Sequence, residues 1–231
     1  MVMTRKPTLK PRDAASLILY RRGPRGAEVL MGQRNAGHAF MPNRYVFPGG
    51  RVDPTDHRVP VASPLDETTA DHLVRSCRSA SRAHAHAITA IRETYEETGL
   101  MIGRPSPLAA RLNERHWAGF RAAGLAPALD RLAYAFRAVT PPHYPRRFDA
   151  RFFLVEMDEC VSGTLNGNGE LEHLAWLPID EALSLPLATP THLALIEIGP
   201  WIEMGRAAAA TRPVPYLFTR QHRHVYTVEQ V

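Results

Sequence analysis

Three carboxylates recur at helical spacing between Arg92 and Leu100, where the sequence reads Arg-Glu-Thr-Tyr-Glu-Glu-Thr-Gly-Leu. With about 100° of rotation per residue, Glu93, Glu96 and Glu97 project from one side of a helix and apolar residues from the other. Carboxylates at this spacing repel one another, and a single arginine cannot neutralise three of them. A divalent cation can, so the run predicts a magnesium site, with a solvated acidic surface as the alternative.

A short β-type run, Val46-Phe47, ends at Pro48-Gly49-Gly50 ahead of this acidic helix. The combination resembles the Nudix hydrolase family. The family pattern is Gly, five residues, Glu, seven residues, then Arg-Glu-apolar-x-Glu-Glu-x-Gly-apolar. Gly50 supplies the opening glycine, and residues 92–100 supply the second half, with Thr94 where an aliphatic residue is usual.

The middle of the pattern departs from the family. Counting forward from Gly50 places the first glutamate at Asp56, whereas counting back from Arg92 places it at His84, 28 residues further on. An insertion at about 57–83 therefore splits the pattern. In the family this glutamate is a structural partner, a role that Asp56 could fill, while His84 reads as an ordinary first-turn residue. We expect the insertion to set the substrate preference.

Further matches narrow the resemblance to one branch of the family. Phe40-Met41-Pro42 precedes the glycine turn, and Thr140-Pro141 leads into the basic and aromatic run 146–153. These features, within a resemblance covering most of residues 13–185, are similar to the branch typified by Nudix-type motif 19, a coenzyme A diphosphatase. The resemblance implies an α/β/α sandwich around a mixed sheet.

The resemblance also implies roles for the acidic residues. Mg²⁺, or Mn²⁺ in its place, would be held by Glu96 and Glu97, with Glu93 as a further ligand or as the group that orients and deprotonates water. A backbone carbonyl at Gly49 or Gly50 would complete the protein ligands, since glycine lets the backbone approach closely. Arg92 would hold the carboxylates in register.

A second acidic position follows the tight turn Asn166-Gly167-Asn168-Gly169. Glu170 matches the loop from which many Nudix enzymes recruit one more carboxylate for metal or water, although a loop glutamate facing solvent is an equal alternative. Three arginines are candidates for substrate phosphate: Arg34, Arg146 and Arg147.

The expected reaction is hydrolysis of a diphosphate bond in a nucleoside diphosphate linked to another group. Coenzyme A or acyl-CoA is the leading substrate, and ADP-ribose, NADH and dinucleoside polyphosphates remain alternatives. A non-catalytic nucleotide sensor is the rival from another class, but such domains typically lose box carboxylates that this chain retains. An enzyme acting on capped RNA is a second rival.

Composition indicates one soluble cytoplasmic domain of 231 residues, of which 45% are hydrophobic. The net charge of +5 is spread along the chain, which disfavours a nucleic-acid partner. Cys77 and Cys160 form no ligand motif, and no apolar stretch approaches a membrane span. A homodimer is left open. His222 and His224 read as surface residues.

The elements that must position these residues follow from patterning. We expect helices over 65–79, with Asp66 as N-cap, and over 105–123, and a closing helix that begins at Ile179. The expected strands are 13–20, 28–31, 45–47, 132–140, 151–157 and an apolar strand 214–219 in a C-terminal extension of about 200–231.

Overall fold

The computed structural model describes residues 9–37, 41–205, 212–221 and 223–229. Phe40 and His222 lie outside the described residues. The chain begins with the hairpin of β1 (Arg12–Gly23) and β2 (Gly26–Arg34), whose last pair is Gly23 opposite Gly26. Gly26 has a φ of 101°, which explains the need for glycine in this tight turn.

Among the described residues, nine strands form one mixed sheet in the order β10-β2-β1-β8-β7-β11-β12, with β3 on β2 and β4 on β1. The pairing of β1 with β8 is parallel, and so is that of β11 with β7; the other pairs are antiparallel. The remaining bounds are β3 Tyr45–Val46, β4 Gly49–Arg51, β7 Ala133–Val139, β8 Phe148–Glu156, β10 Leu171–Pro178, β11 Pro215–Arg220 and β12 Arg223–Val228.

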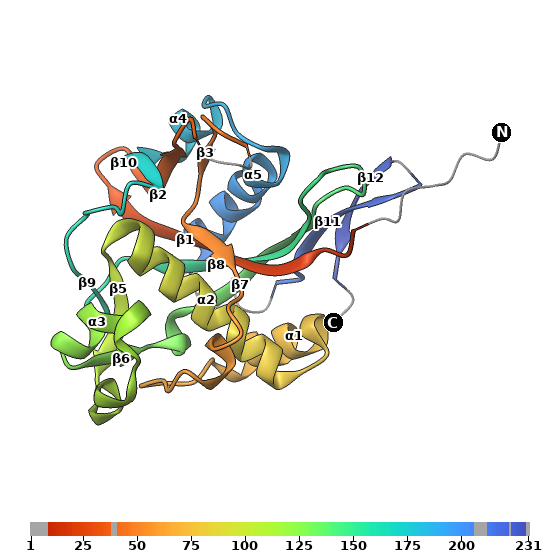
Figure 1. The fold of residues 1–231 in the computed structure, drawn as a ribbon. Helices are drawn as coiled ribbons and strands as arrows, with labels where there is room; N and C mark the ends of the chain where they lie inside the picture. The colour runs from red at the N-terminus through yellow and green to blue at the C-terminus, as the bar shows by residue number, and fades with distance from the viewer. Residues whose placement is uncertain (1–8, 38–40, 206–211, 222, 230–231) are drawn as a thin grey trace.

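Helices cover both faces of this sheet (Figure 1). Leu17 and Leu19 of β1 point into the core shared with α1 (Glu67–Cys77), α2 (Ala80–Thr98) and α3 (Glu114–Ala122). Ile18 and Tyr20, one residue out of phase, join the core on the other face beneath α4 (Ile179–Leu183) and α5 (Thr189–Met204). The α/β/α sandwich with a mixed sheet is confirmed.

Residues 57–83, where the sequence predicts an insertion, include the helix α1, capped as expected by Asp66, whose carboxylate accepts a hydrogen bond from Thr69 N at 3.0 Å. This helix does not continue into α2. Arg78 adopts a left-handed conformation with a φ of 57°, and Ser79 then caps α2. The insertion thus packs beside α2 as a separate helix.

The expected helix over 105–123 is only partly correct. Residues Met101–Pro105 form β5, Pro107–Arg111 a 3₁₀ turn, and only Glu114–Ala122 an α-helix. The side chains of Ser106 and Asn113 each accept a backbone hydrogen bond and start separate helical segments, which interrupts the pattern. β5 pairs with β6 (Leu125–Pro127) and β9 (Val161–Ser162) in a small second sheet.

The expected strand 214–219 is confirmed as β11, which pairs with β12 in a hairpin at the edge of the large sheet. In the part of the chain that the structure describes, none of the helices has the length and apolar character needed to cross a bilayer.

Candidate active site

The C-terminal half of α2 meets the glycine turn of β4. Glu97 is almost fully buried, and its Oε2 accepts a hydrogen bond from Gly49 N at 2.8 Å. A Cβ at Gly49 would lie 2.5 Å from the backbone oxygen of Ala15, and one at Gly50 would lie 2.4 Å from the carboxyl carbon of Glu93. Backbone packing therefore requires glycine at position 49, whereas a Cβ at position 50 would displace the Glu93 carboxylate.

Arg92 connects the carboxylates around this turn. Its guanidinium donates to Glu93 at 2.7 Å, to Glu96 at 3.2 Å and to the backbone oxygen of Arg51 at 3.1 Å. Burial lowers the pKa of Arg92, but its hydrogen bond to Asp56 and the neighbouring negative charges outweigh burial and raise that pKa. Arg92 stays protonated and fixes the direction of Glu93.

Asp56 fills the role of the missing first glutamate. It is buried in a 3₁₀ turn (Asp56–Arg58), and its two oxygens accept from Arg92 Nε and Nη2, each at 3.0 Å. Thr89 Oγ1 also donates to Asp56 at 2.7 Å. His84 instead lies in the second turn of α2, one turn later than expected, with Nε2 at 3.0 Å from Val59 O, and is an ordinary helix residue.

Glu170 is delivered to the same place by the loop ahead of β10. Asn166 N donates to Thr98 O at 2.9 Å, which docks this loop on the end of α2. Asn35 Nδ2 donates to Gly169 O at 3.0 Å, which ties the loop to the end of β2 next to Arg34. Glu93, Glu97, Glu170 and Arg34 consequently line one cavity.

Glu93, Glu97 and Glu170, called the carboxylate corner below, share one cavity, and the two helix carboxylates among them are largely shielded from solvent. Burial raises the pKa of Glu97 to about 8; the Gly49 N–H opposes the shift, whereas the charges of Glu93 and Glu170 add to it. Burial also raises the pKa of Glu93, against the influence of Arg92. The pKa of Arg34 is lowered by burial, although Glu97, Glu170 and Glu93 favour its charge.

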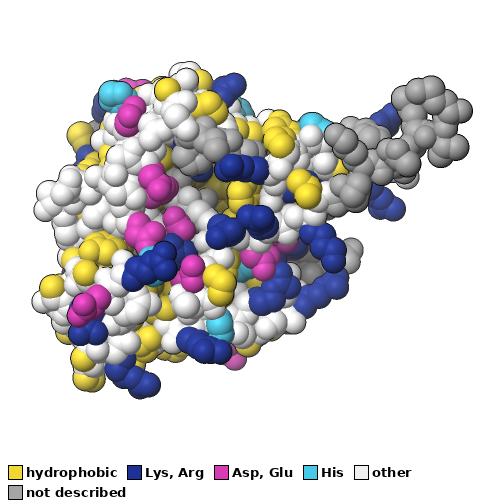
Figure 2. All heavy atoms as spheres, in the orientation of Figure 1, with side chains coloured by type: hydrophobic (Ala, Val, Ile, Leu, Met, Phe, Trp, Pro, Cys, Tyr) yellow, Lys and Arg dark blue, Asp and Glu magenta, His cyan; other side chains and the backbone are white. Residues whose placement is uncertain are grey.

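Oxygen donors of this kind suit a hard divalent cation. Glu93, Glu97 and Glu170 line the cavity beside a glycine backbone, and burial is the main cause of the raised pKa of Glu93 and of Glu97. Figure 2 shows acidic side chains gathered near the C-terminal end of α2, with basic side chains beside them. The donor set fits a divalent cation.

Glu96 takes a different position from the other two helix carboxylates. Its Oε1 lies 2.6 Å from His116 Nδ1 of α3, and its Oε2 accepts from Arg92. Glu96 is next to the site but does not line the cavity.

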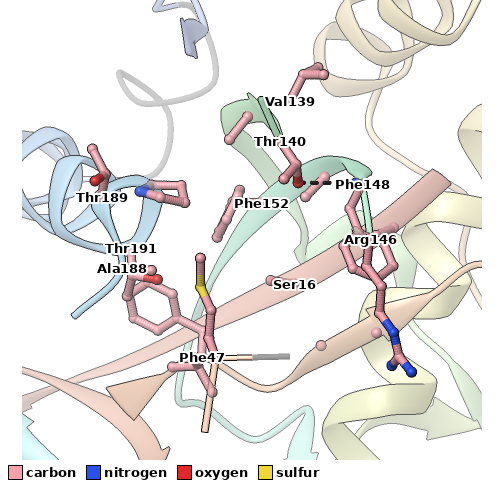
Figure 3. Close-up of a pocket in the computed structure, with 18 of the residues that line it drawn as sticks. Ser16, Phe47, Val139, Thr140, Arg146, Phe148, Phe152, Ala188, Thr189 and Thr191 are labelled. Carbon is pink, nitrogen blue, oxygen red and sulfur yellow. Dashed lines mark hydrogen bonds between the residues drawn. The ribbon is translucent and has the colours of Figure 1, made fainter. Parts of the chain in front are cut away.

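The cavity has a volume of about 410 Å³ and extends from the carboxylates to the N-terminus of α5 and the C-terminal hairpin. Arg146 lines it, on the side opposite Phe47 and Thr189 in the view of Figure 3. Arg147 is not brought to it, since its guanidinium donates to the backbone oxygens of Thr140 and Leu9.

None of residues 57–83 lines the cavity. The segment expected to set the substrate preference therefore lies away from the cavity in which a substrate would bind. Leu217, in the apolar strand expected at 214–219, and His224, expected to be a surface residue and exposed in the structure, do line it. A sequence signal for them would require knowing that β11 pairs with β7.

Comparisons with known proteins agree with this fold. No family model matches the chain. A Caenorhabditis elegans protein named "Putative nudix hydrolase 7" is 28% identical over 199 residues, covering 80% of this chain; the chain spans 59% of that relative's length. The crystal structure of a NUDIX hydrolase from Alicyclobacillus acidocaldarius matches with a TM-score of 0.59 and 30% identity, covering 82% of this chain and 91% of the other. The fold and the carboxylate corner define a Nudix-type protein. The chain belongs to the Nudix hydrolase family.

Proposed function

We propose that the chain is a Mg²⁺-dependent hydrolase that cleaves the diphosphate bond of a nucleoside diphosphate linked to another group. The observation that carries this proposal is that Glu93, Glu97 and Glu170 line one cavity together with the glycine turn. A diphosphate resists nucleophiles because its own oxygens are negative, so hydrolysis requires that this charge be neutralised and a water be aligned.

Glu93, Glu97 and Glu170 would hold the ion together with the backbone carbonyl of Gly50. Glu96 stays a predicted ligand, and its carboxylate would have to leave His116 to join them. When bound, the ion neutralises phosphate oxygens and makes a coordinated water more acidic.

The chain's own residues supply position and proton transfer. The Gly49 N–H holds Glu97 in place, and Arg92 holds Glu93. Both carboxylates are therefore kept in one conformation that faces the cavity. Glu93 or Glu170 accepts the proton of the attacking water. Arg34 and Arg146, which line the same cavity, contact the substrate phosphates.

Coenzyme A or an acyl-CoA is the leading substrate, with cleavage to 3′,5′-ADP and a 4′-phosphopantetheine product. The test is a Mg²⁺-dependent hydrolysis screen over coenzyme A, ADP-ribose, NADH, diadenosine polyphosphates and nucleoside triphosphates, with products identified by mass. Turnover of at least one diphosphate that needs Mg²⁺ and Glu97 supports the proposal. Nucleotide that binds but survives intact with Mg²⁺ would favour a sensor instead.

A further inference from the structure

Beyond the carboxylates, the cavity becomes a largely apolar compartment. Phe47 and Phe152 form one wall and meet edge to face, with ring centroids 6.4 Å apart and an interplanar angle of 83°. Phe152 is held in turn by Phe136, at 5.6 Å and 73°. The Thr140 hydroxyl at the rim already accepts from Phe148 N at 3.0 Å (Figure 3). Thr140, Thr189, Thr191 and His224 also line this part of the cavity, but most of its lining is apolar and the phenylalanine rings are fixed by packing.

The C-terminal hairpin closes this compartment. Leu217 of β11 is 6% exposed and lies beside Ala138 of β7, with which it shares the cavity wall. His224 of β12, opposite Thr219, projects on the same face of the hairpin and also lines the cavity. Leu217 and His224, both from the C-terminal hairpin, therefore line the same cavity as the glycine turn and the acidic helix of residues 49–97.

Glu229, the residue that follows β12, connects the hairpin to the core. Glu229 accepts hydrogen bonds from Tyr134 Oη at 2.8 Å, from Ser76 Oγ at 3.1 Å and from Arg137 Nη1. Arg137 is itself fixed by a bidentate contact with Asp149, at 2.8 and 2.7 Å. The cavity wall formed by the hairpin is consequently in place before a ligand arrives.

The hairpin also contacts the opposite helical layer. The hydroxyl of Tyr226, which pairs with Leu217 across the hairpin, donates to Glu197 of α5. α5 supplies Thr189, Pro190 and Thr191 to the cavity. The hairpin and α5 thus form one wall of the cavity, which α1 does not line.

Resting on the proposed diphosphate hydrolysis, we infer that the hairpin β11–β12 selects the group attached to the diphosphate and that this group presents an uncharged, mainly apolar portion to the hairpin. With the phosphates held by the carboxylate corner and the arginines, the attached group extends along Phe47, Phe152 and Leu217. Each methylene that it buries there strengthens binding about fourfold.

The test uses two synthetic substrates with Mg²⁺, the methyl and the n-hexyl ester of adenosine 5′-diphosphate, each linked through the terminal phosphate. For the unmodified protein, kcat/KM is expected to be at least tenfold higher for the hexyl ester, with the difference in KM. Leu217→Ala should lower this hexyl-to-methyl ratio at least threefold. Phe218→Ala is the matched control, since Phe218 is the next residue on β11, faces the other way and does not line the cavity.

His224→Leu provides a second variant at an exposed position, where the fold tolerates substitution. By adding apolar surface to the wall, it should raise the hexyl-to-methyl ratio at least twofold. Equal kcat/KM values for the two esters in the unmodified protein would overturn the inference and leave the proposed hydrolysis standing. A ratio that Leu217→Ala, confirmed as folded by circular dichroism, leaves unchanged would also overturn it. Failure to hydrolyse these esters and every substrate of the wider screen would instead overturn the proposed function.

Discussion

Arg92 and Asp56 form a buried, two-pronged ion pair in which Nε and Nη2 each lie 3.0 Å from a different oxygen of the carboxylate. Their side chains are only 4% and 1% exposed. Removing one partner of such a pair leaves the other charge buried. The pair therefore joins the loop after the glycine turn to the acidic helix.

Asp56→Asn is expected to lower the free energy of unfolding by about 3 kcal/mol, because Arg92 loses its main counter-charge in the interior. Turnover should fall as well, since Arg92 also directs Glu93. Urea unfolding at neutral pH measures the first effect. Asp53→Asn, at a half-buried carboxylate in the same loop, is the control and should cost less than about 1 kcal/mol. Equal losses in the two variants would contradict a special role for Asp56.

Glu97→Gln should reduce turnover by about 10²-fold or more, because the amide cannot supply the negative oxygen that a cation needs. The fold should persist, since the amide oxygen can still accept from Gly49 N. Steady-state rates at saturating Mg²⁺ measure the effect, with Glu114→Gln at a highly exposed position as control. Near-normal rates in Glu97→Gln would show that Glu97 is not a ligand.

The two glycines of the turn should respond differently to alanine. At Gly49 the new Cβ meets the backbone of β1, so Gly49→Ala should lower the free energy of unfolding by about 2 kcal/mol. At Gly50 it meets only the end of the Glu93 side chain, so Gly50→Ala should cost less stability but reduce turnover about tenfold or more by displacing that carboxylate. Thermal unfolding and kcat, measured on both variants, distinguish the two effects. The reverse order of effects would refute this division.

His86 should make the fold sensitive to acid. Its Nδ1 lies 3.0 Å from Arg82 O and its Nε2 lies 2.8 Å from Arg151 Nη1, an arrangement that suits the neutral ring. Burial, together with Arg151, lowers the pKa of His86 to about 3 in the folded protein. The unfolded chain, with an ordinary histidine pKa of about 6.5, takes up a proton that the folded state refuses.

Stability should therefore fall as the pH drops from about 6.5 towards 3, by at most about 1.4 kcal/mol per pH unit from this group. His86→Gln keeps an acceptor for Arg151 without a titrating ring, so its unfolding free energy should depend less on pH in this window. Urea unfolding between pH 4 and 7 measures both slopes. Parallel slopes would mean that His86 carries no part of the acid sensitivity.

The carboxylate corner was predictable because its members are close in sequence or follow a glycine turn. Helical spacing alone places Glu93 and Glu97 on one face. The choice between Asp56 and His84 was not predictable from counting, because it depends on which residue the folded loop brings to Arg92. Glu96 could be placed on the right face, but not beside His116, which comes from another helix.

The compartment wall could not be predicted for a different reason. Leu217 reaches the cavity through a parallel pairing of β11 with β7, between residues about 80 positions apart, and an apolar strand pattern does not specify its partner. The prediction of one helix over 105–123 was wrong for a local reason. The side chains of Ser106 and Asn113 cap two separate helical segments within a stretch whose apolar spacing resembles one continuous helix.

The insertion makes the chain between Gly50 and Arg92 about three times as long as an uninterrupted motif would need. Closing a flexible loop of that greater length costs only about 1 kcal/mol more in entropy, a penalty that α1 further reduces by being ordered against α2. Within this segment, the Asp56–Arg92 ion pair connects residues 56 and 92 and so forms a shorter closed loop. Residues added between Asp56 and Arg92 should therefore hardly change the geometry of the acidic helix. The length of this segment can vary while the carboxylate corner stays the same.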